Sequence, residues 1–388
     1  MTKILIFSVP FNGHLNILKA LIQELETTCE FTLVITGWKN IQPDLNGISC
    51  KTIVLAKSTL QETDPALWTF PRIVELLDDC ISITSTFKPD VIIYDFFSLE
   101  GHIVGKLLNI PYWCSIPAMI GPFETQAYLH RKLSSTRNQQ ALKHLKKLGI
   151  SIDHHEIEMV SDGLHIPGQL NLIWSYPSLT SPQFMQNRKP LPYIFVGNLR
   201  GEKSVPKRKN NTPVIYFSLG TVVMNNLWNQ QRQTRTALKN FIARIAKLWQ
   251  HKKITVIFVS QGKRVLNHYP KNWRVVDHTN QVGTLSRADI FVTHGGSNSF
   301  HEAALQHVPM VVIPFFGDQL LVAQQVQRLG IGINLGRDTG IGTKKSKGFL
   351  NNALVKRLDH AVFQILNDKK YAHAYHKFTF EKTSLSLK

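Results

Sequence analysis

The second half of the chain has few acidic residues. Residues 201–388 contain 28 Lys and Arg but only nine Asp and Glu, whereas residues 1–200 contain 17 of each class. The second half therefore carries the whole formal net charge of +19. A basic surface of this size attracts anionic ligands to the half that carries it. A purely solvated basic surface and contact with an anionic membrane are alternative interpretations of the surplus.

The sequence also lacks the features of several protein classes. No apolar run approaches the roughly 20 residues of a membrane-spanning helix, and no low-complexity tract suggests disorder. Cys29, Cys50, Cys80 and Cys114 are widely spaced and form no Cys-x-x-Cys pair. This spacing favours free thiols in a reducing cytoplasm over disulfides or a zinc site. The apolar stretch at residues 4–9 is short and leads into a helix pattern, so we expect a strand there and no signal peptide.

Apolar runs and helical patterns alternate along the chain. At 388 residues the chain has room for two domains, and the alternation predicts an α/β fold with parallel, doubly wound sheets. The expected elements cover residues 4–9, 16–26, 31–35, 52–55, 70–87 and 91–94 in the first half, and residues 214–219, 233–249, 254–259, 273–276, 290–293, 309–314 and 354–367 in the second.

The stretch RGEKSVPKRKNNTP has no hydrophobic pattern and is expected to be a linker. We therefore assign residues 1–199 to an N-terminal domain and residues 200–213 to the linker. Residues 214–370 form the expected C-terminal domain, and residues 371–388 a tail.

Residues 291–319, FVTHGGSNSFHEAALQHVPMVVIPFFGDQ, are the most informative segment. An apolar strand breaks at Gly295-Gly296, where missing side chains let a ligand approach the backbone. Ser297 to Ser299 then open a helix, whose free N–H groups and positive dipole end favour a diphosphate. The next strand ends at Asp318-Gln319. Because parallel strands present their carboxyl ends at one edge of a sheet, both stretches can meet one ligand.

This segment resembles the donor-binding signature of the nucleotide-sugar glycosyltransferases that act on small molecules, the family of plant, macrolide and glucuronosyl transferases. The resemblance implies the glycosyltransferase B architecture, in which two Rossmann-like domains face each other across a cleft. It also implies a nucleotide sugar, with UDP as the expected nucleotide, as co-substrate and no other cofactor. The implied contacts are His294, Gly296, Asn298 and Ser299 with the diphosphate, Glu302 with the ribose, and Asp318 and Gln319 with the hexose hydroxyls.

Other stretches extend the implied donor site. Ser218 and Thr221 follow a strand at a place where the family has a hydroxyl that bonds a phosphate oxygen, although turn residues of this kind often bond only locally. Where the family pattern has Trp-x-Pro-Gln, this chain reads His278-Thr279-Asn280-Gln281. His278 is therefore placed at the residue that stacks on the base, with Gln281 at the end of the pattern.

Glu302 has an alternative interpretation. Ser299-Phe300-His301-Glu302 also fits the capping-box pattern Ser-x-x-Glu, in which the glutamate serves only the N-terminus of its own helix.

His14 and Asp95 are the candidate catalytic pair. His14 lies near the start of a helix, whose positive dipole end favours neutral imidazole, the form that accepts a proton. Asp95 ends another predicted strand on the same edge, where a carboxylate can bond the other ring nitrogen and fix the tautomer. The family pairs a histidine and an aspartate at these places, and Gly13-His14-Leu15-Asn16 resembles its Gly-His-x-Asn-Pro stretch. A backbone-bonded histidine and a loop-capping aspartate are the alternatives.

These residues predict an inverting glycosyltransferase that moves a hexose from a UDP-sugar to a hydroxyl of a small, largely apolar acceptor. One base and no carboxylate nucleophile are visible, which favours direct displacement. No Asp-x-Asp occurs in the sequence, so we expect no bridging metal. Candidate acceptor-pocket residues are Trp68, Phe70, Trp113, Met119, Phe123 and Tyr128.

Several other functions are open alternatives, among them an inactive relative that still binds nucleotide. A nucleotide-sugar epimerase or a membrane-associated lipid glycosyltransferase would keep the same fold. A basic nucleic-acid-binding protein would explain the charge, but the basic residues are not interleaved with aromatics, so we expect no nucleic-acid partner.

Overall fold

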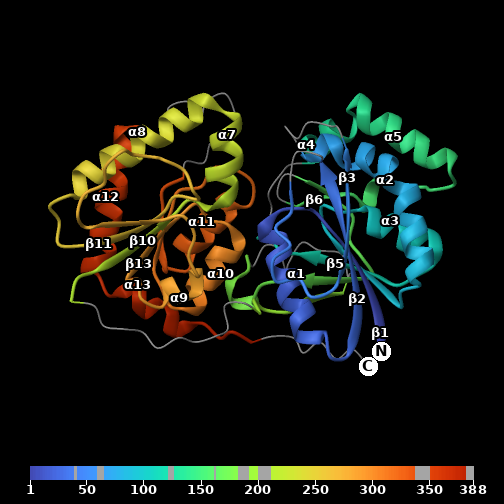
Figure 1. Ribbon diagram of the computed structural model, residues 1–388, viewed down its shortest axis with the longest axis horizontal. Helices are drawn as coiled ribbons and strands as arrows, with labels where there is room; N and C mark the ends of the chain where they lie inside the picture. Colours follow the sequence, from blue (N-terminus) through green and yellow to red (C-terminus); the bar gives the residue numbers. More distant parts are fainter. Residues whose placement is uncertain are drawn as a thin grey trace. The chain divides into compact units, whose positions relative to one another are not determined.

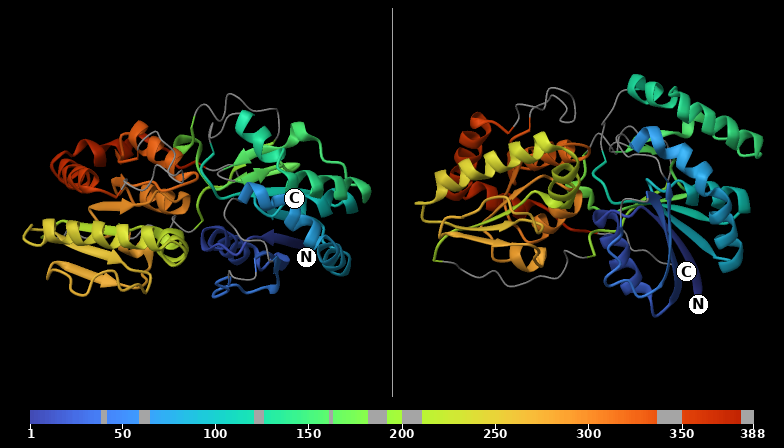
Figure 2. Two further views of the ribbon diagram at one scale, coloured as in Figure 1. Left: turned by 90° about the horizontal axis from the view of Figure 1, so that it is seen from above. Right: turned by 45° about the horizontal axis from the view of Figure 1, so that its top comes forward.

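The computed structural model describes residues 1–38, 42–58, 65–120, 126–160, 163–181, 192–199, 211–336 and 350–381. The chain divides into two compact units, Met1–Leu199 and Arg200–Phe380, and the described residue Glu381 belongs to the first (Figures 1 and 2). Most of the expected linker, residues 200–210, lies outside the described residues.

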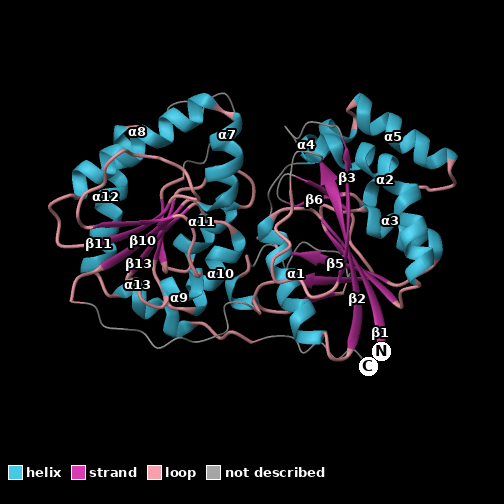
Figure 3. Ribbon diagram, in the orientation of Figure 1, coloured by secondary structure: helices cyan, strands magenta, loops and turns pink. Residues whose placement is uncertain are grey.

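A parallel sheet forms the centre of the first unit (Figure 3). Its order is β3-β2-β1-β4-β5-β8-β9, and every neighbouring pair of strands is parallel. The strands are β1 (Thr2–Ser8), β2 (Cys29–Trp38), β3 (Lys51–Ser58), β4 (Val91–Asp95), β5 (Tyr112–Ile116), β8 (Leu170–Ile173) and β9 (Tyr193–Phe195). The helices are α1 (Asn12–Leu25), α2 (Pro65–Phe87), α3 (Glu100–Leu108), α4 (Gln126–Leu133) and α5 (Thr136–Lys147). Shorter elements are η1 (His154–Glu156), β6 (Glu158–Val160), β7 (Gly163–His165) and η2 (Pro177–Leu179).

Strand β1 lies between two hydrophobic cores. Ile4 and Ile6 pack with the apolar face of α1, whereas Leu5 and Phe7 belong to the core that α2 and α3 cover on the other side. Successive side chains of a strand point to opposite faces, so a strand buried on both faces is apolar throughout. The uninterrupted run of β1 is explained by this double burial.

The second unit repeats the plan with six parallel strands in the order β12-β11-β10-β13-β14-β15. The strands are β10 (Val214–Ser218), β11 (Thr255–Val259), β12 (Trp273–Val276), β13 (Ile290–Thr293), β14 (Met310–Val312) and β15 (Gly332–Asn334). The main helices are α8 (Arg232–Trp249), α9 (Gln281–Leu285), α10 (Ser297–Leu305), α11 (Gln319–Arg328) and α12 (Asn352–Asn367). A π-helical turn η3 (Val222–Leu227) and α7 (Trp228–Gln230) follow β10, and α13 (Lys370–His373) and η5 (Ala374–Lys377) follow α12.

Each sheet reverses its strand order beside its first strand. β1 lies between β2 and β4, and β10 lies between β11 and β13. In open α/β sheets, ligands bind outside the carboxyl ends of the strands at such a reversal. Asp95 is the last residue of β4, and His14 follows β1 in the first turn of α1. Gly220 and His294 follow β10 and β13.

The predicted fold class, two α/β units with parallel sheets, is confirmed. The structure differs from the expectation at the tail, because residues 370–377 are helical and the buried Tyr375 donates its hydroxyl to the Val308 carbonyl at 2.7 Å. Residues 382–388 lie outside the described residues. Within the described ranges, no helix is long and apolar enough to cross a membrane.

Candidate functional site

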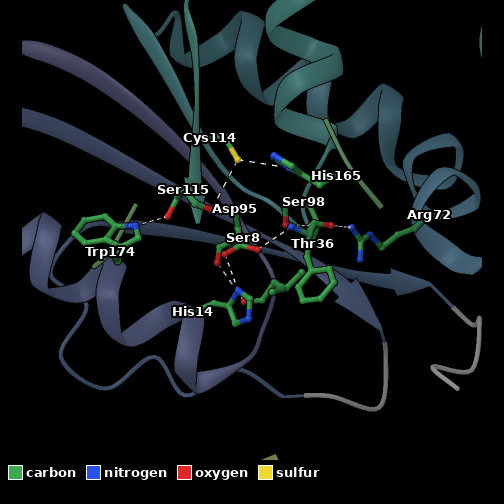
Figure 4. Close-up of polar contacts among 12 residues, drawn as sticks. Ser8, His14, Thr36, Arg72, Asp95, Ser98, Cys114, Ser115, His165 and Trp174 are labelled. Carbon is green, nitrogen blue, oxygen red and sulfur yellow. Dashed lines mark hydrogen bonds and ion pairs between the residues drawn. The ribbon is translucent and has the colours of Figure 1, made fainter. Parts of the chain in front are cut away.

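His14 and Asp95 form a hydrogen-bonded pair in the first unit (Figure 4). His14 lies in the first turn of α1, and its Nδ1 is 2.6 Å from Oδ2 of Asp95, the last residue of β4. A carboxylate only accepts hydrogen bonds, so Nδ1 carries a proton, and in the neutral form of the ring Nε2 is the nitrogen without one. The other oxygen of Asp95 accepts the Phe97 N–H at 2.9 Å. Asp95 is 1% exposed and His14 16%, so the histidine ring is the part of the pair that solvent reaches.

Three phenylalanine rings surround the His14 ring. The ring centroids of Phe11, Phe96 and Phe97 lie 5.8, 5.6 and 5.5 Å from that of His14. Phe11 and Phe97 are half-buried and Phe96 is fully buried. The sequence prediction missed these residues, although all three are close in sequence to His14 or Asp95.

The predicted acceptor residues have a different arrangement. Phe70 is fully buried in the core of the first unit, and Met119 is also buried, so neither presents an accessible surface. Trp113 is half-buried in β5. Phe123 lies outside the described residues, and the side chains of Trp68 and Tyr128 are not described.

His294 lies between two glycines in the second unit. A Cβ placed on Gly220 would be 2.3 Å from His294 Cε1, and one placed on Gly296 would be 2.7 Å from Nε2. Gly220 also has a φ of +75°, a conformation that costs other residues about 1–2 kcal/mol. Burial lowers the pKa of His294 to about 4, and Nδ1 has no hydrogen-bond partner within the described residues. The ring is therefore neutral at pH 7 and offers a hydrogen bond rather than a charge.

Helix α10 begins at Ser297, after the two glycines that follow this histidine. Its N-cap is Gly296, and no side chain caps it. The first N–H groups of a helix have no partner within the helix, so they can receive an anion. Asn298 and Ser299 lie in this first turn and are half-buried. The predicted helix opening at residues 297–299 is confirmed.

Glu302 belongs to a polar cluster with α9. The Gln281 amide nitrogen donates to Glu302 Oε2 at 2.6 Å and to Ser299 Oγ at 3.0 Å, and the Tyr216 hydroxyl donates to Gln281 Oε1 at 3.1 Å. Burial raises the pKa of Tyr216. The capping-box alternative is wrong, because Ser299 lies inside α10 and not at its N-cap. Glu302 itself is 1% exposed, so the half-buried Gln281 is the more accessible group.

The remaining predicted donor residues follow other strands. Gln319 begins α11 after β14, and its Oε1 accepts the N–H groups of Phe315 and Phe316 at 2.8 and 3.3 Å. Among the described residues, the structure shows no hydrogen bond from its amide nitrogen. Asp318, the N-cap of α11, is half-buried.

Ser218, Thr221 and His278 complete the set of predicted donor residues. Ser218, at the end of β10, is buried, and Thr221 is half-buried just before η3. His278 is exposed in the connection between the edge strand β12 and α9, and the structure shows it in no contact with the other predicted donor residues among those described. Gly220 was not predicted, although a glycine after an apolar strand was a visible signal.

Comparisons with known proteins agree with this arrangement. The model of the family "UDP-glucoronosyl and UDP-glucosyl transferase" matches residues 195–377. The NDP-glycosyltransferase YjiC of Bacillus subtilis (strain 168) is 26% identical over 358 residues, which are 85% of this chain and 84% of that protein. These matches show a glycosyltransferase related to the UDP-glycosyltransferase family.

Solved structures share the fold of this glycosyltransferase. The crystal structure of the kitacinnamycin glycosyltransferase has a TM-score of 0.73 and 20% identity, covering 97% of this chain and 93% of that one. The spinosyn rhamnosyltransferase SpnG, complexed with thymidine diphosphate, has a TM-score of 0.68 and 15% identity, covering 97% and 95%. UDP-glycosyltransferases use a nucleotide sugar as co-substrate and act without a metal ion. The described residues contain no group of three His, Cys, Asp or Glu side chains that could hold one.

Proposed function

We propose that this glycosyltransferase moves a hexose from a UDP-sugar, with inversion at the anomeric carbon, to a hydroxyl of a small, largely apolar acceptor. His14 is the general base and Asp95 orients it. The observation that carries the proposal is the 2.6 Å contact between His14 Nδ1 and Asp95 Oδ2 at the strand reversal of the first sheet.

The pair has the properties of a base and its orienting partner. Asp95 holds the Nδ1 proton, which leaves the Nε2 lone pair to accept the proton of an acceptor hydroxyl. The buried carboxylate then stabilises the imidazolium as it forms. Each oxygen of Asp95 already accepts a hydrogen bond, one from His14 and one from the Phe97 N–H, so the carboxylate is not placed as a nucleophile. This supports a single displacement, in which the configuration of the sugar inverts.

The second unit supplies the donor-binding groups. The uncapped N-terminus of α10 and the neutral ring of His294 match a diphosphate, whose charge grows as the glycosidic bond breaks. Gln281 and Glu302 are assigned to the ribose, His278 to the base, and Asp318 and Gln319 to the hexose, with Ser218 and Thr221 behind the phosphates. The match to the UDP-sugar family favours uridine over the thymidine that SpnG binds.

The surroundings of His14 favour an apolar acceptor. Phe11 and Phe97 present partly exposed rings within 6 Å of the histidine ring. An aromatic or polyketide alcohol would remove these rings from water while its hydroxyl meets Nε2.

The decisive experiment compares transfer with donor binding. Purified protein is incubated with UDP-hexoses, TDP-hexoses and phenolic acceptors, and NMR establishes the anomeric configuration of the product. We expect His14→Ala to lower kcat by about 10²–10⁴-fold with donor affinity unchanged, and the exposed His360→Ala to behave like the wild type. Wild-type kcat in His14→Ala, retention of configuration, or conversion of the donor without any acceptor would each overturn the proposal.

A further inference from the structure

A buried ion pair lies behind the turn that carries Asp95. Arg72 of α2 and Glu100, the first residue of α3, are 2% and 0% exposed. Arg72 Nε donates to Glu100 Oε1 at 2.7 Å, and Nη2 donates to Oε2 at 3.4 Å. Figure 4 shows the Arg72 side chain extending toward Thr36 and Ser98. Neither charged residue touches His14, so the proposed chemistry does not account for them.

The guanidinium also contacts the turn itself. Arg72 Nη2 donates to the carbonyl oxygen of Phe97, and the N–H of the same residue donates to Asp95 Oδ1 at 2.9 Å. A continuous series of hydrogen bonds therefore runs from Glu100 through Arg72, Phe97 and Asp95 to His14. Phe97 is the link, because its two backbone groups bond Arg72 and Asp95.

The other side of the turn is fixed as well. The Ser98 N–H donates to the Asp95 carbonyl at 2.6 Å, and the Ser98 hydroxyl is 2.9 Å from that of Thr36. Thr36 in turn donates to Glu100 Oε2 at 3.5 Å. Glu100 thus has two routes to residues 95–98, one through Arg72 and one through Thr36 and Ser98.

Stability alone is a weak reason for such a pair. Taking two charges out of water costs about as much as their attraction returns, and apolar residues of similar volume often serve equally well. The pair instead fixes the orientation of the Phe97 carbonyl relative to Glu100, because the planar guanidinium holds its N–H groups in a rigid fork that binds both.

We propose that Arg72, held by Glu100, is a positioning residue that fixes the Asp95–Ser98 turn so that the carboxylate of Asp95 meets Nδ1 of His14. The inference rests on the proposed function of His14 and Asp95. Without the Arg72 contact, the Phe97 peptide groups can turn, Asp95 Oδ1 loses its fixed donor, and the carboxylate samples other orientations. A base that is oriented for only part of the time lowers kcat, whereas donor binding depends on other residues.

The test uses variants that leave no unpaired buried charge. Arg72→Lys keeps a cation beside Glu100 but lacks the planar fork, and Arg72→Met combined with Glu100→Gln removes both charges together. The matched control is Lys252→Met, which breaks the ion pair with Asp359 in the second unit. Circular dichroism and the Tm establish that each variant is folded. Each change is also made in the Asp95→Asn background.

We expect the double variant to lower kcat by about 10–100-fold with donor KM within about two-fold, and Arg72→Lys to retain more activity than the double variant. In the Asp95→Asn background the same changes should lower kcat by less than about two-fold, since a residue that acts through Asp95 has nothing left to position. Lys252→Met should lower the Tm without changing kcat.

Two results would overturn the inference: a folded double variant with wild-type kcat, or an equal loss of kcat with and without the Asp95 carboxylate. If Asp95→Asn itself has wild-type kcat, the proposed function has failed. If Asp95→Asn is impaired and the Arg72 variants are not, only the positioning role has failed.

Discussion

The ring of His294 occupies the space in which any side chain on Gly220 would lie. The two residues follow neighbouring strands, β10 and β13, and a Cβ on Gly220 would lie 2.3 Å from Cε1 and 2.5 Å from Nε2 of the ring. The glycine therefore allows a buried imidazole to pack directly against the backbone at the carboxyl edge of the second sheet. His294 is the residue proposed to bind the diphosphate. Its position therefore depends on the turn at Gly220, which follows the first strand of the second unit, β10.

We expect Gly220→Ala to raise the Kd for UDP by about 10-fold or more, because the new methyl group pushes the His294 ring away from its position, and about 1.4 kcal/mol of lost contact is enough for that effect. Isothermal titration with UDP measures it. Gly262→Ala is the matched control, since Gly262 has a similar φ of +71° but no atom within 4 Å of its Cβ position. The control should lose about 1 kcal/mol of stability and keep its affinity for UDP. Equal affinities in the two variants would show that His294 does not bind the diphosphate.

Asp95→Asn should reduce kcat by about 10²–10⁴-fold with little change in donor affinity. An asparagine that turns its amide nitrogen toward His14 Nδ1 favours the tautomer with the proton on Nε2, which cannot then accept a proton. The change preserves the shape of the side chain, and its Oδ1 can still accept the Phe97 N–H. Steady-state kinetics with both substrates varied gives the two effects separately. A variant that kept more than about a third of the wild-type kcat would be incompatible with a tautomer-fixing role.

Gln319 allows sugar recognition to be separated from loop structure. Its Oε1 accepts the N–H groups of Phe315 and Phe316, so only the amide nitrogen is available to a hexose hydroxyl. Gln319→Glu keeps an acceptor for the loop and removes the donor. We expect the Kd for the UDP-hexose to rise by about 5–20-fold, as for one lost hydrogen bond of about 1–2 kcal/mol, while the Kd for UDP alone stays the same. Parallel weakening of both ligands would indicate a loop defect instead.

The sequence predicted the parts of the fold that depend on local pattern. β1 and β4 each contain an uninterrupted apolar run because these runs are buried on both faces, so the positions of the strands and of the residues after them could be predicted from the sequence alone. Strands β8 and β9 were not predicted. They are four and three residues long, and the stretch around them shows no alternation that distinguishes a short strand from a loop. The helical segment at residues 370–377 was missed because its anchor, Tyr375, bonds a carbonyl that is distant in the sequence.

The sequence could predict contacts of the candidate site between motif residues that follow strands ending at one sheet edge. It could not predict contacts that depend on how helices pack against one another. The proximity of His14 to Asp95 follows from two strands that end at one sheet edge. The contact of Gln281 with Glu302 joins two helices, and only the folded chain shows it. Arg72 is a lone cation in an apolar helix, and nothing in the sequence pairs it with Glu100. A mid-helix arginine is usually solvent-exposed, so its burial is known only from the structure.

The buried His102 predicts how stability depends on pH. Burial, together with the nearby Lys106, lowers the pKa of His102 to about 3, whereas a histidine in an unfolded chain has a pKa of about 6.5. Between these values the unfolded chain binds a proton that the folded chain does not. The stabilising contribution is therefore complete above about pH 6.5 and is lost as the pH falls toward 3, by about 1.4 kcal/mol per pH unit.

His102→Phe removes this dependence while filling the same space beside Tyr94 and Tyr112. Urea unfolding at pH 7 and pH 5 measures the free energy of unfolding. We expect it to fall by about 2 kcal/mol more in the wild type than in the variant when the pH is lowered from 7 to 5. The Tyr94 hydroxyl still donates to the Ile166 carbonyl, so the cost of the change at pH 7 should be no more than about 1 kcal/mol. Substitution of the exposed His154 by Gln should leave the wild-type difference intact. If His102→Phe lost as much stability on acidification as the wild type, burial would not keep His102 unprotonated in the folded chain at pH 5.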